Sequence, residues 1–167
     1  MFEEEFKTTF ESRVPLYEDE LREIFNESKN LALDHFNKKA LGEVSEDYIE
    51  DLQMKFDQRY SQYKAENENE SWKSCQIFLQ NQYQMIEDKL RNQEYQSFNE
   101  FTSDISSFQE MFVENGPPGP NRKTIMLEFV VWAVADASEY FLRSITHELK
   151  LSSKMNKETV IKLEANI

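Results

Sequence analysis

Residues 116–120 read Gly116-Pro117-Pro118-Gly119-Pro120, and this stretch decides how the chain is organised. It holds two of the three glycines and three of the four prolines among 167 residues. Glycine and proline interrupt helices, because glycine costs backbone entropy and proline lacks an amide hydrogen. A chain with so few breakers can form long helices, and this one is expected to change direction here. The stretch is therefore predicted to be a joint between two helical blocks, 1–115 and 121–167, of a single helical domain spanning 1–167.

On the N-terminal side of this joint, apolar residues recur every three or four positions, as on one face of a helix. The pattern predicts a short helix before Pro15 and a second helix that runs to about Leu41 and ends at Gly42. Ser45 is expected to cap a third helix of about 45–50 residues, since no Gly or Pro follows before the joint. Its inner row comprises Tyr48, Leu52, Phe56, Tyr60, Tyr63, Asn67, Ser71, Cys75, Leu79, Tyr83, Ile86 and Leu90.

The remaining segments also have helical periodicity. Residues 98–112 form a shorter repeat, and Asn121 or Thr124 is expected to cap the last major helix. Ser152-Ser153 weakens the pattern, which predicts a separate helix near the C-terminus. The predicted inner face of the last major helix comprises Met126, Val130, Ala133, Ala137, Phe141, Ile145 and Leu149. The expected fold is all-α: an elongated bundle of about four to six helices that includes one very long helix and no sheet.

Charge limits the partners of the chain. The net charge is -13, and residues 1–120 carry 26 acidic against 12 basic residues. An acidic surface repels nucleic acid and anionic lipid headgroups, so no nucleic-acid partner and only an indirect membrane association are expected. Cys75 is the single cysteine, which fits a reducing compartment, the cytoplasm. The most apolar run, 125–135, is too short for a transmembrane segment.

Residues that carry out catalysis or bind cofactors are not evident. Three glycines leave no room for a phosphate-binding loop, and His35 and His147 lie far apart on separate predicted helices. The acidic cluster at Glu43, Glu46, Asp47, Glu50 and Asp51 is interpreted as the charged start of a helix, without the turn that would converge its oxygens on a cation. We therefore expect no catalytic residue, no cofactor and no metal.

Three small or polar residues replace the large apolar ones in the middle of the long helix. Asn67, Ser71 and Cys75 follow one another at steps of four, which places them on one helix face. If that face is packed, small side chains allow a neighbouring helix to approach closely and Asn67 needs a hydrogen-bond partner. The alternative is a locally exposed stretch among Glu66, Glu68 and Glu70. The pattern alone leaves both interpretations open.

The stretch from Ala32 to Leu79 resembles the C-terminal helical region of guanylate-binding proteins, which are dynamin-like large GTPases related to the atlastins. The matching positions are Ala32, Phe36, Tyr48 and Leu52, followed by Tyr63, Asn67, Ser71 and Cys75 at the family's spacing. Pro120-Asn121-Arg122-Lys123 is similar to a further family segment that precedes a helix. The match is looser beyond Leu90, where Tyr95 lacks the Pro-Gly-Gly turn that usually follows it in the family. The three-helix bundle of atlastins shares the early part of the pattern.

The resemblance implies a role without catalysis. In the family, an N-terminal GTPase domain precedes this region, which acts as a middle domain or stalk that relays the nucleotide state into self-association or membrane attachment. No GTP-binding motif occurs in this chain, so the implied partners are a GTPase domain, in cis or in trans, and further copies in a homo-oligomer. The alternative is an independent all-α protein–protein interaction module that shares only the periodicity of a helical bundle.

Overall fold

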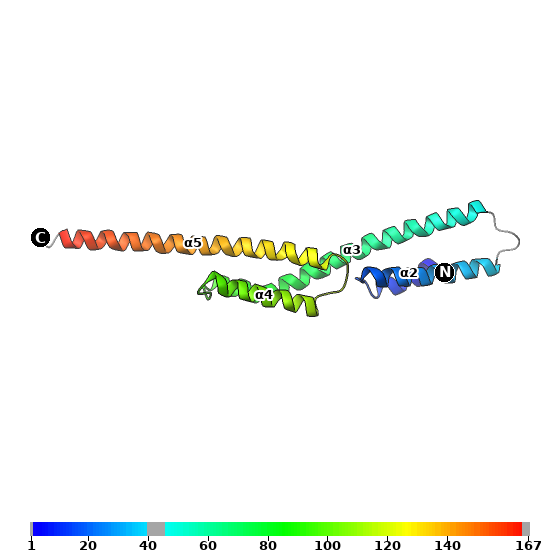
Figure 1. The fold of residues 1–167 in the computed structure, drawn as a ribbon, viewed down its shortest axis with the longest axis horizontal. Coiled ribbons are helices and arrows are strands. Elements are labelled where there is room, and N and C mark those ends of the chain that lie inside the picture. The colour runs from blue at the N-terminus through cyan, green and yellow to red at the C-terminus, as the bar shows by residue number, and fades with distance from the viewer. Residues whose placement is uncertain (1, 40–45, 165–167) are drawn as a thin grey trace. The chain divides into compact units, whose positions relative to one another are not determined.

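A computed structural model of the protein describes residues 2–39 and 46–164, which form five helices and no strand (Figure 1). The helices are α1 (Phe2–Glu11), α2 (Glu18–Lys39), α3 (Glu46–Arg91), α4 (Phe98–Asn115) and α5 (Arg122–Glu164). The predicted all-α class and the very long helix are confirmed, since α3 alone has 46 residues. Gly42 and Ser45, the expected end of one helix and cap of the next, lie outside the described residues.

Two expectations about the last helix are wrong. α5 continues through Ser152-Ser153 to Glu164, so the separate helix predicted near the C-terminus is part of α5. Serine lowers helix stability by only a few tenths of a kcal/mol, too little to end a helix by itself. Ile145, predicted on the inner face, is 54% exposed, whereas Ala133 and Ala137 are fully buried as expected. The side chain of Leu149 lies outside the described part of the structure.

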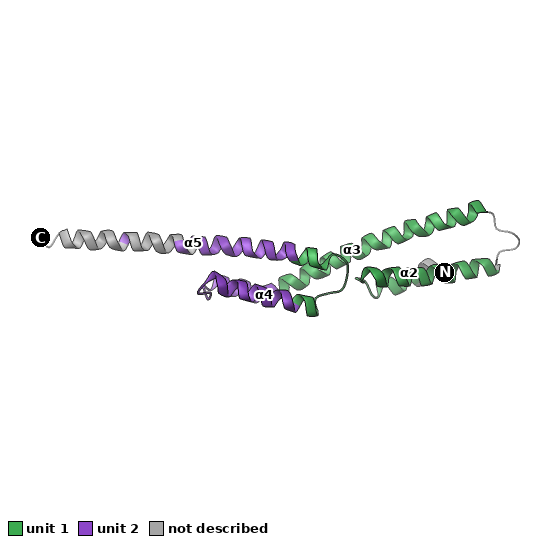
Figure 2. Ribbon diagram, in the orientation of Figure 1, with its two compact units in different colours: residues 1–81, 112–126 green, residues 82–111, 127–167 purple. Residues whose placement is uncertain are grey.

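The chain divides into two compact units (Figure 2). Unit 1 consists of residues 1–81 and 112–126, and unit 2 of residues 82–111 and 127–167. Both α3 and α5 therefore contribute to each unit, and the predicted joint at 116–120 lies within unit 1.

Aromatic rings from three helices form the core of unit 1. Phe6 is fully buried on α1, with its ring centre 5.3 Å from that of Phe25 on α2 and 4.5 Å from that of Tyr63 on α3. These rings meet edge to face, an arrangement that adds about 0.5–1.5 kcal/mol per pair to the burial of apolar area. The other buried members of this core are Phe10, Leu16, Leu21 and Phe56.

Unit 2 has its own core of α3, α4 and α5 residues. Tyr83 on α3 contacts Phe108 on α4 and Phe129 on α5, with ring centres 6.1 and 5.3 Å away. Burial raises the pKa of Tyr83 to about 12, and the carboxylates of Asp136 and Glu87 contribute. Buried alanines on α5 bring its backbone close to this core, because they occupy little space.

The connection between α3 and α4 forms without the Pro-Gly-Gly turn of the family. Two residues after the end of α3, Gln93 adopts a left-handed conformation (φ 59°). The Gln93 and Glu94 amides donate to the carbonyls of Leu90 and Lys89, which is the hydrogen-bond pattern of a Schellman cap. Ser97 then caps α4 by accepting from the amide of Glu100 at 3.3 Å. A glutamine therefore occupies the place where glycine is usual, at a cost in backbone strain.

Across residues 2–39 and 46–164, none of the helices combines the length and hydropathy that a membrane crossing requires.

Candidate functional site

Asn67 holds the connection between α1 and α2 from the middle of α3. Its side chain is 1% exposed, and its Oδ1 accepts a hydrogen bond from the Leu16 amide at 2.7 Å. Its Nδ2 donates to the Leu16 carbonyl at 2.8 Å. Both main-chain groups of Leu16 are thus satisfied by one side chain 51 positions away. A buried asparagine with two such bonds fixes the path of the backbone that it holds.

One turn further along α3, Ser71 holds the connection between α4 and α5. Its Oγ donates to the Pro120 carbonyl at 2.8 Å. A Cβ added to Gly119 would lie 2.3 Å from this Oγ and 2.6 Å from the Ser71 Cβ, and Gly119 has a φ of +127°. Glycine is therefore required here for both space and backbone conformation. The small residues of α3 allow the loop between α4 and α5 to approach closely at this point. The sequence analysis expected a neighbouring helix here instead.

The same loop also approaches the connection between α1 and α2. A Cβ at Gly119 would lie 3.3 Å from the Pro15 Cβ, which immediately precedes the Leu16 that Asn67 holds. Two connections that are about a hundred residues apart in sequence thus meet on one face of α3. We call this set the junction: Leu16, Asn67, Ser71, Gly119 and Arg122.

Arg122 joins the junction from the first turn of α5. Its guanidinium donates to the carbonyls of Phe112 at 3.0 Å, Val113 at 3.3 Å and Gly116 at 3.3 Å, at the C-terminal end of α4. It also donates to the Tyr17 hydroxyl at 3.1 Å, beside the start of α2. A cation is favourable at a helix C-terminus, where the last carbonyls have no partner within the helix. Arg122 therefore caps α4 from the following helix and reaches α2 as well.

The sequence analysis placed Arg122 in a family-like segment but assigned it no role. A cation in the first turn of a helix opposes that helix's own dipole, which makes it an unpromising candidate. A signal was nevertheless present, because the last turn of α4 contains no basic residue and Arg122 is the first cation after it. A basic residue that follows a short connection can supply the missing cap.

Cys75 completes the row of small residues on α3. It is fully buried, and burial raises the pKa of its thiol, although a hydrogen bond with Ser71 opposes that shift. A thiol that stays protonated is a poor nucleophile. Cys75 is thus a small core residue, and the row is packed, which settles the alternative of an exposed stretch.

The remaining residues singled out in the sequence lie elsewhere in unit 1. Phe36 stacks on Tyr48, with ring centres 5.4 Å apart, and Tyr63 packs in the aromatic core. Ala32 and Leu52 are partly buried against the same core. The structure brings none of these five into the junction, so the predicted motif residues form two groups.

The other residues of the predicted joint are placed around the end of α4. The Gly116 carbonyl accepts from Arg122, and a Cβ at Gly116 would lie 2.5 Å from the Phe112 carbonyl oxygen. Pro117 is half-buried and Pro118 is exposed. The joint is thus held by its two glycines and by the Pro120 carbonyl.

The junction holds three connected segments of the chain to one another through hydrogen bonds. Its polar atoms are an amide, a hydroxyl, main-chain groups and a guanidinium. Among the described residues, no cluster of His, Cys, Asp or Glu could hold a metal ion; Glu43 of the acidic cluster lies outside them.

Comparison with known proteins identifies a family for the chain. Residues 2–165 match the family model described as "Guanylate-binding protein, C-terminal domain". The chain has no match among curated proteins or among solved structures.

Proposed function

The chain belongs to the guanylate-binding protein C-terminal domain family, and we propose that it relays the nucleotide-dependent state of a GTPase domain into assembly or membrane association. In this role it is a non-catalytic helical domain, and the GTPase domain is provided in cis or in trans. The junction is the observation that carries the proposal. It ties two distant connections to one turn of α3, so a displacement of either connection acts on the other.

Packed polar contacts suit such a relay better than a purely apolar interface. Asn67 and Ser71 form directional hydrogen bonds whose loss leaves buried groups unpaired. Such contacts resist small distortions and break together, so the connections move jointly between discrete arrangements. The apolar core beside them tolerates small changes in the orientation of its side chains, because dispersion contacts have no preferred direction.

Exposed apolar side chains on α5 support assembly as the output. Leu127, Val131, Leu142 and Ile145 are each more than half exposed. At 100° per residue they fall within about 60° of one another around the helix, so they form a single row. Residues 121–167 carry seven basic and six acidic residues, so this helix lacks the net negative charge that opposes contact between copies elsewhere. Exposed apolar side chains that share one face of a helix are typical of interaction surfaces.

The test is addition of the purified chain to a purified guanylate-binding GTPase domain. The proposal predicts a complex in analytical ultracentrifugation and a changed rate of GTP turnover. Gly119→Ala, which disturbs the junction, is expected to reduce the change in turnover, whereas Asn69→Ala, on the exposed side of α3, leaves it intact. Absence of both binding and a turnover effect would instead favour an interaction module unrelated to GTPases.

A further inference from the structure

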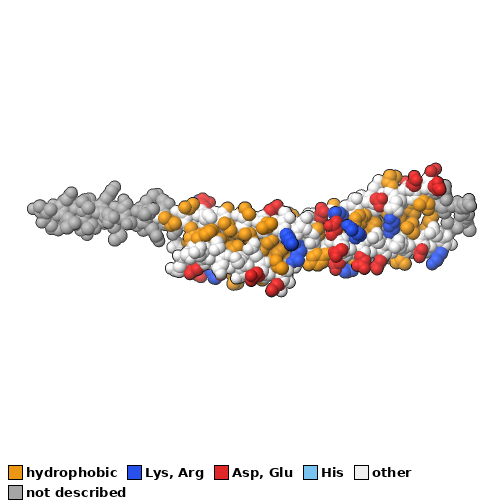
Figure 3. Space-filling view, viewed as in Figure 1, with side chains coloured by type: hydrophobic (Ala, Val, Ile, Leu, Met, Phe, Trp, Pro, Cys, Tyr) orange, Lys and Arg blue, Asp and Glu red, His pale blue; other side chains and the backbone are white. Residues whose placement is uncertain are grey.

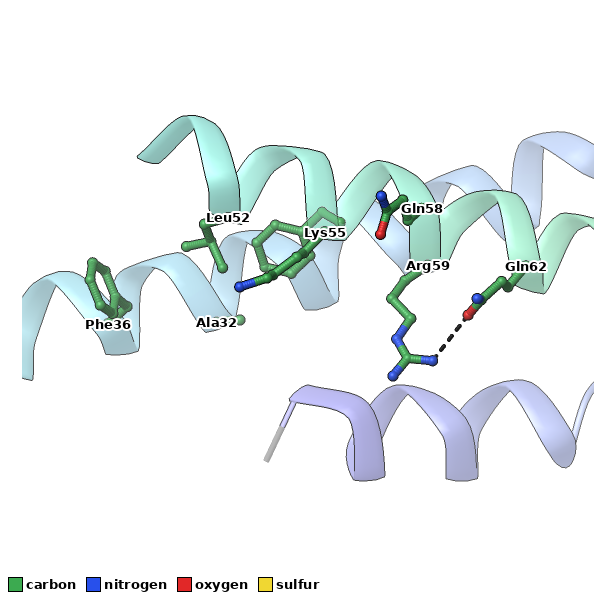
Figure 4. A pocket seen from close by; sticks show the side chains of 8 residues that line it. Ala32, Phe36, Leu52, Lys55, Gln58, Arg59 and Gln62 are labelled. Atoms are coloured by element: carbon green, nitrogen blue, oxygen red, sulfur yellow. Dashed lines mark hydrogen bonds between the residues drawn. The ribbon is translucent and has the colours of Figure 1, made fainter. Parts of the chain in front are cut away.

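A cavity of about 600 Å³ opens between α2 and α3 in unit 1, and no junction residue lines it. Its size lies within the range of small-molecule sites, about 300–1,000 Å³. The described residues that line it are Ala32, Phe36, Leu52, Lys55, Phe56, Gln58, Arg59 and Gln62 (Figure 4).

The lining divides into an apolar and a polar half. Ala32 and Phe36 on α2, with Leu52 and Phe56 on α3, supply the apolar half. The polar half comes from one side of α3, where Lys55, Gln58, Arg59 and Gln62 follow at steps of one, three or four. Figure 4 shows the Lys55 side chain extending across the space between the two helices. An apolar surface beside cationic side chains is suited to a ligand that has a hydrocarbon part and an anionic group.

The charge of the lining is opposite to that of the chain. The protein has 32 acidic residues, yet none of the eight described lining residues is acidic. A third cation lies beside the floor, since the Lys29 ammonium is 5.5 Å from the centre of the Phe56 ring. On the face shown in Figure 3, Lys and Arg side chains lie among hydrophobic and acidic ones over the part that holds α2 and the start of α3.

The two lining cations already have polar neighbours that fix their positions. Lys55 donates to Asp51 at 2.6 Å, and this bond raises the pKa of Lys55 and keeps it protonated. Arg59 donates to the Gln62 side-chain oxygen at 3.0 Å, the bond drawn in Figure 4. A ligand anion would share these donors, because an ammonium has three N–H groups and a guanidinium has five.

We propose that this cavity binds a single-chain amphiphilic anion, with its hydrocarbon chain on the apolar half and its carboxylate or sulfonate at Lys55. Charge complementarity selects an anion, and the apolar half selects a ligand that carries hydrocarbon over a compact ion such as phosphate. Charge-assisted hydrogen bonds orient the headgroup, and burial of the methylene groups supplies most of the affinity. This site is independent of the proposed relay.

The test uses the full chain with dodecanoate as the ligand and anilinonaphthalene sulfonate as the fluorescent probe. Dodecanoate is expected to displace the probe at micromolar concentration, below its micelle-forming range, whereas dodecyltrimethylammonium, of equal chain length and opposite charge, is not. Isothermal titration of dodecanoate should give one site per chain. Displacement by both amphiphiles alike, or binding only to anionic phosphatidylglycerol vesicles, would overturn the proposal.

Variants locate the binding. Lys55→Gln is expected to weaken dodecanoate about tenfold, since a charge-assisted bond is lost. Lys73→Gln is the matched control, because Lys73 is also exposed on α3 and donates to Glu70 at 2.6 Å, outside the cavity. Ala32→Phe should occupy part of the apolar half and weaken dodecanoate binding, with helicity unchanged. If that variant fails to fold, the comparison of the two lysine variants decides, and equal affinities for both refute the site.

Discussion

Replacement of Asn67 by alanine tests the junction most sharply. The substitution leaves the amide and the carbonyl of Leu16 buried and without partners, because Asn67 supplies both of their hydrogen bonds. Each unpaired main-chain group costs about 1–3 kcal/mol. Alanine is the better helix former by about 0.6 kcal/mol, which offsets part of this loss. The free energy of unfolding should therefore fall by about 1–5 kcal/mol.

The assay is urea unfolding followed by tryptophan fluorescence. The chain has Trp72 in unit 1 and Trp132 in unit 2, so Trp132→Phe leaves a single reporter next to Ser71. With a slope of about 2 kcal/mol per molar urea, the midpoint should shift by about 0.5–2.5 M. The control is Asn69→Ala, the same change on the exposed side of α3, which should leave the midpoint unchanged or raise it. Equal midpoints for the two variants would show that Asn67 does not hold the connection.

Other substitutions test further parts of the structure. Gly119→Ala should destabilise unit 1 by about 3 kcal/mol in urea unfolding, through a clash and a strained positive φ. Arg122→Ala should lower stability by about 2 kcal/mol, and Arg122→Lys should not restore it, because an ammonium cannot reach several carbonyls at fixed angles. Gln93→Gly should raise the thermal unfolding midpoint, with a gain of about 1 kcal/mol from relief of the left-handed conformation. A hydrogen bond from Lys89 lowers the pKa of Asp104 in the folded protein. The ionised Asp104 therefore stabilises the fold fully above the pKa that it has in the unfolded chain, and this stabilisation is lost as the pH falls through the lower pKa of the folded state. Asp104→Asn should therefore flatten the loss of unit 2 stability in acid titration below about pH 4, and an unchanged profile would refute this assignment.

The helices could be predicted from the sequence because the spacing of apolar residues that indicates a helix lies within each segment. The three-four spacing of apolar residues from Tyr48 to Leu90 is visible without any partner, and the scarcity of Gly and Pro predicts the length of α3. Failures occurred where a local rule is weak. Ser152-Ser153 was interpreted as the end of a helix, although serine lowers helix stability only slightly. Ile145 fits the apolar spacing of the inner face, but its side chain is exposed in the structure.

The junction could be predicted only in parts. Asn67 with Ser71, and the glycines of 116–120, each stood out as departures from helical composition. Their meeting depends on chain segments 49 and 51 positions apart, and no local pattern records such a pairing. The role of Arg122 was missed because its partners are carbonyls, which every residue possesses. The positive φ of Gln93 was hidden for a similar reason, since a left-handed residue is recognised in a sequence when it is glycine or asparagine.

The central claim is that the two connections are coupled through α3, and hydrogen exchange at the Leu16 amide tests it directly. This amide donates to Asn67 and reports the connection between α1 and α2. Ser71→Ala removes the bond that holds the other connection at the Pro120 carbonyl and adds no atom beside Pro15. Coupling predicts that the Leu16 amide then exchanges at least about tenfold faster, equivalent to about 1.4 kcal/mol of lost protection. An unchanged rate at Leu16, with faster exchange confined to the start of α5, would show that the two connections respond independently.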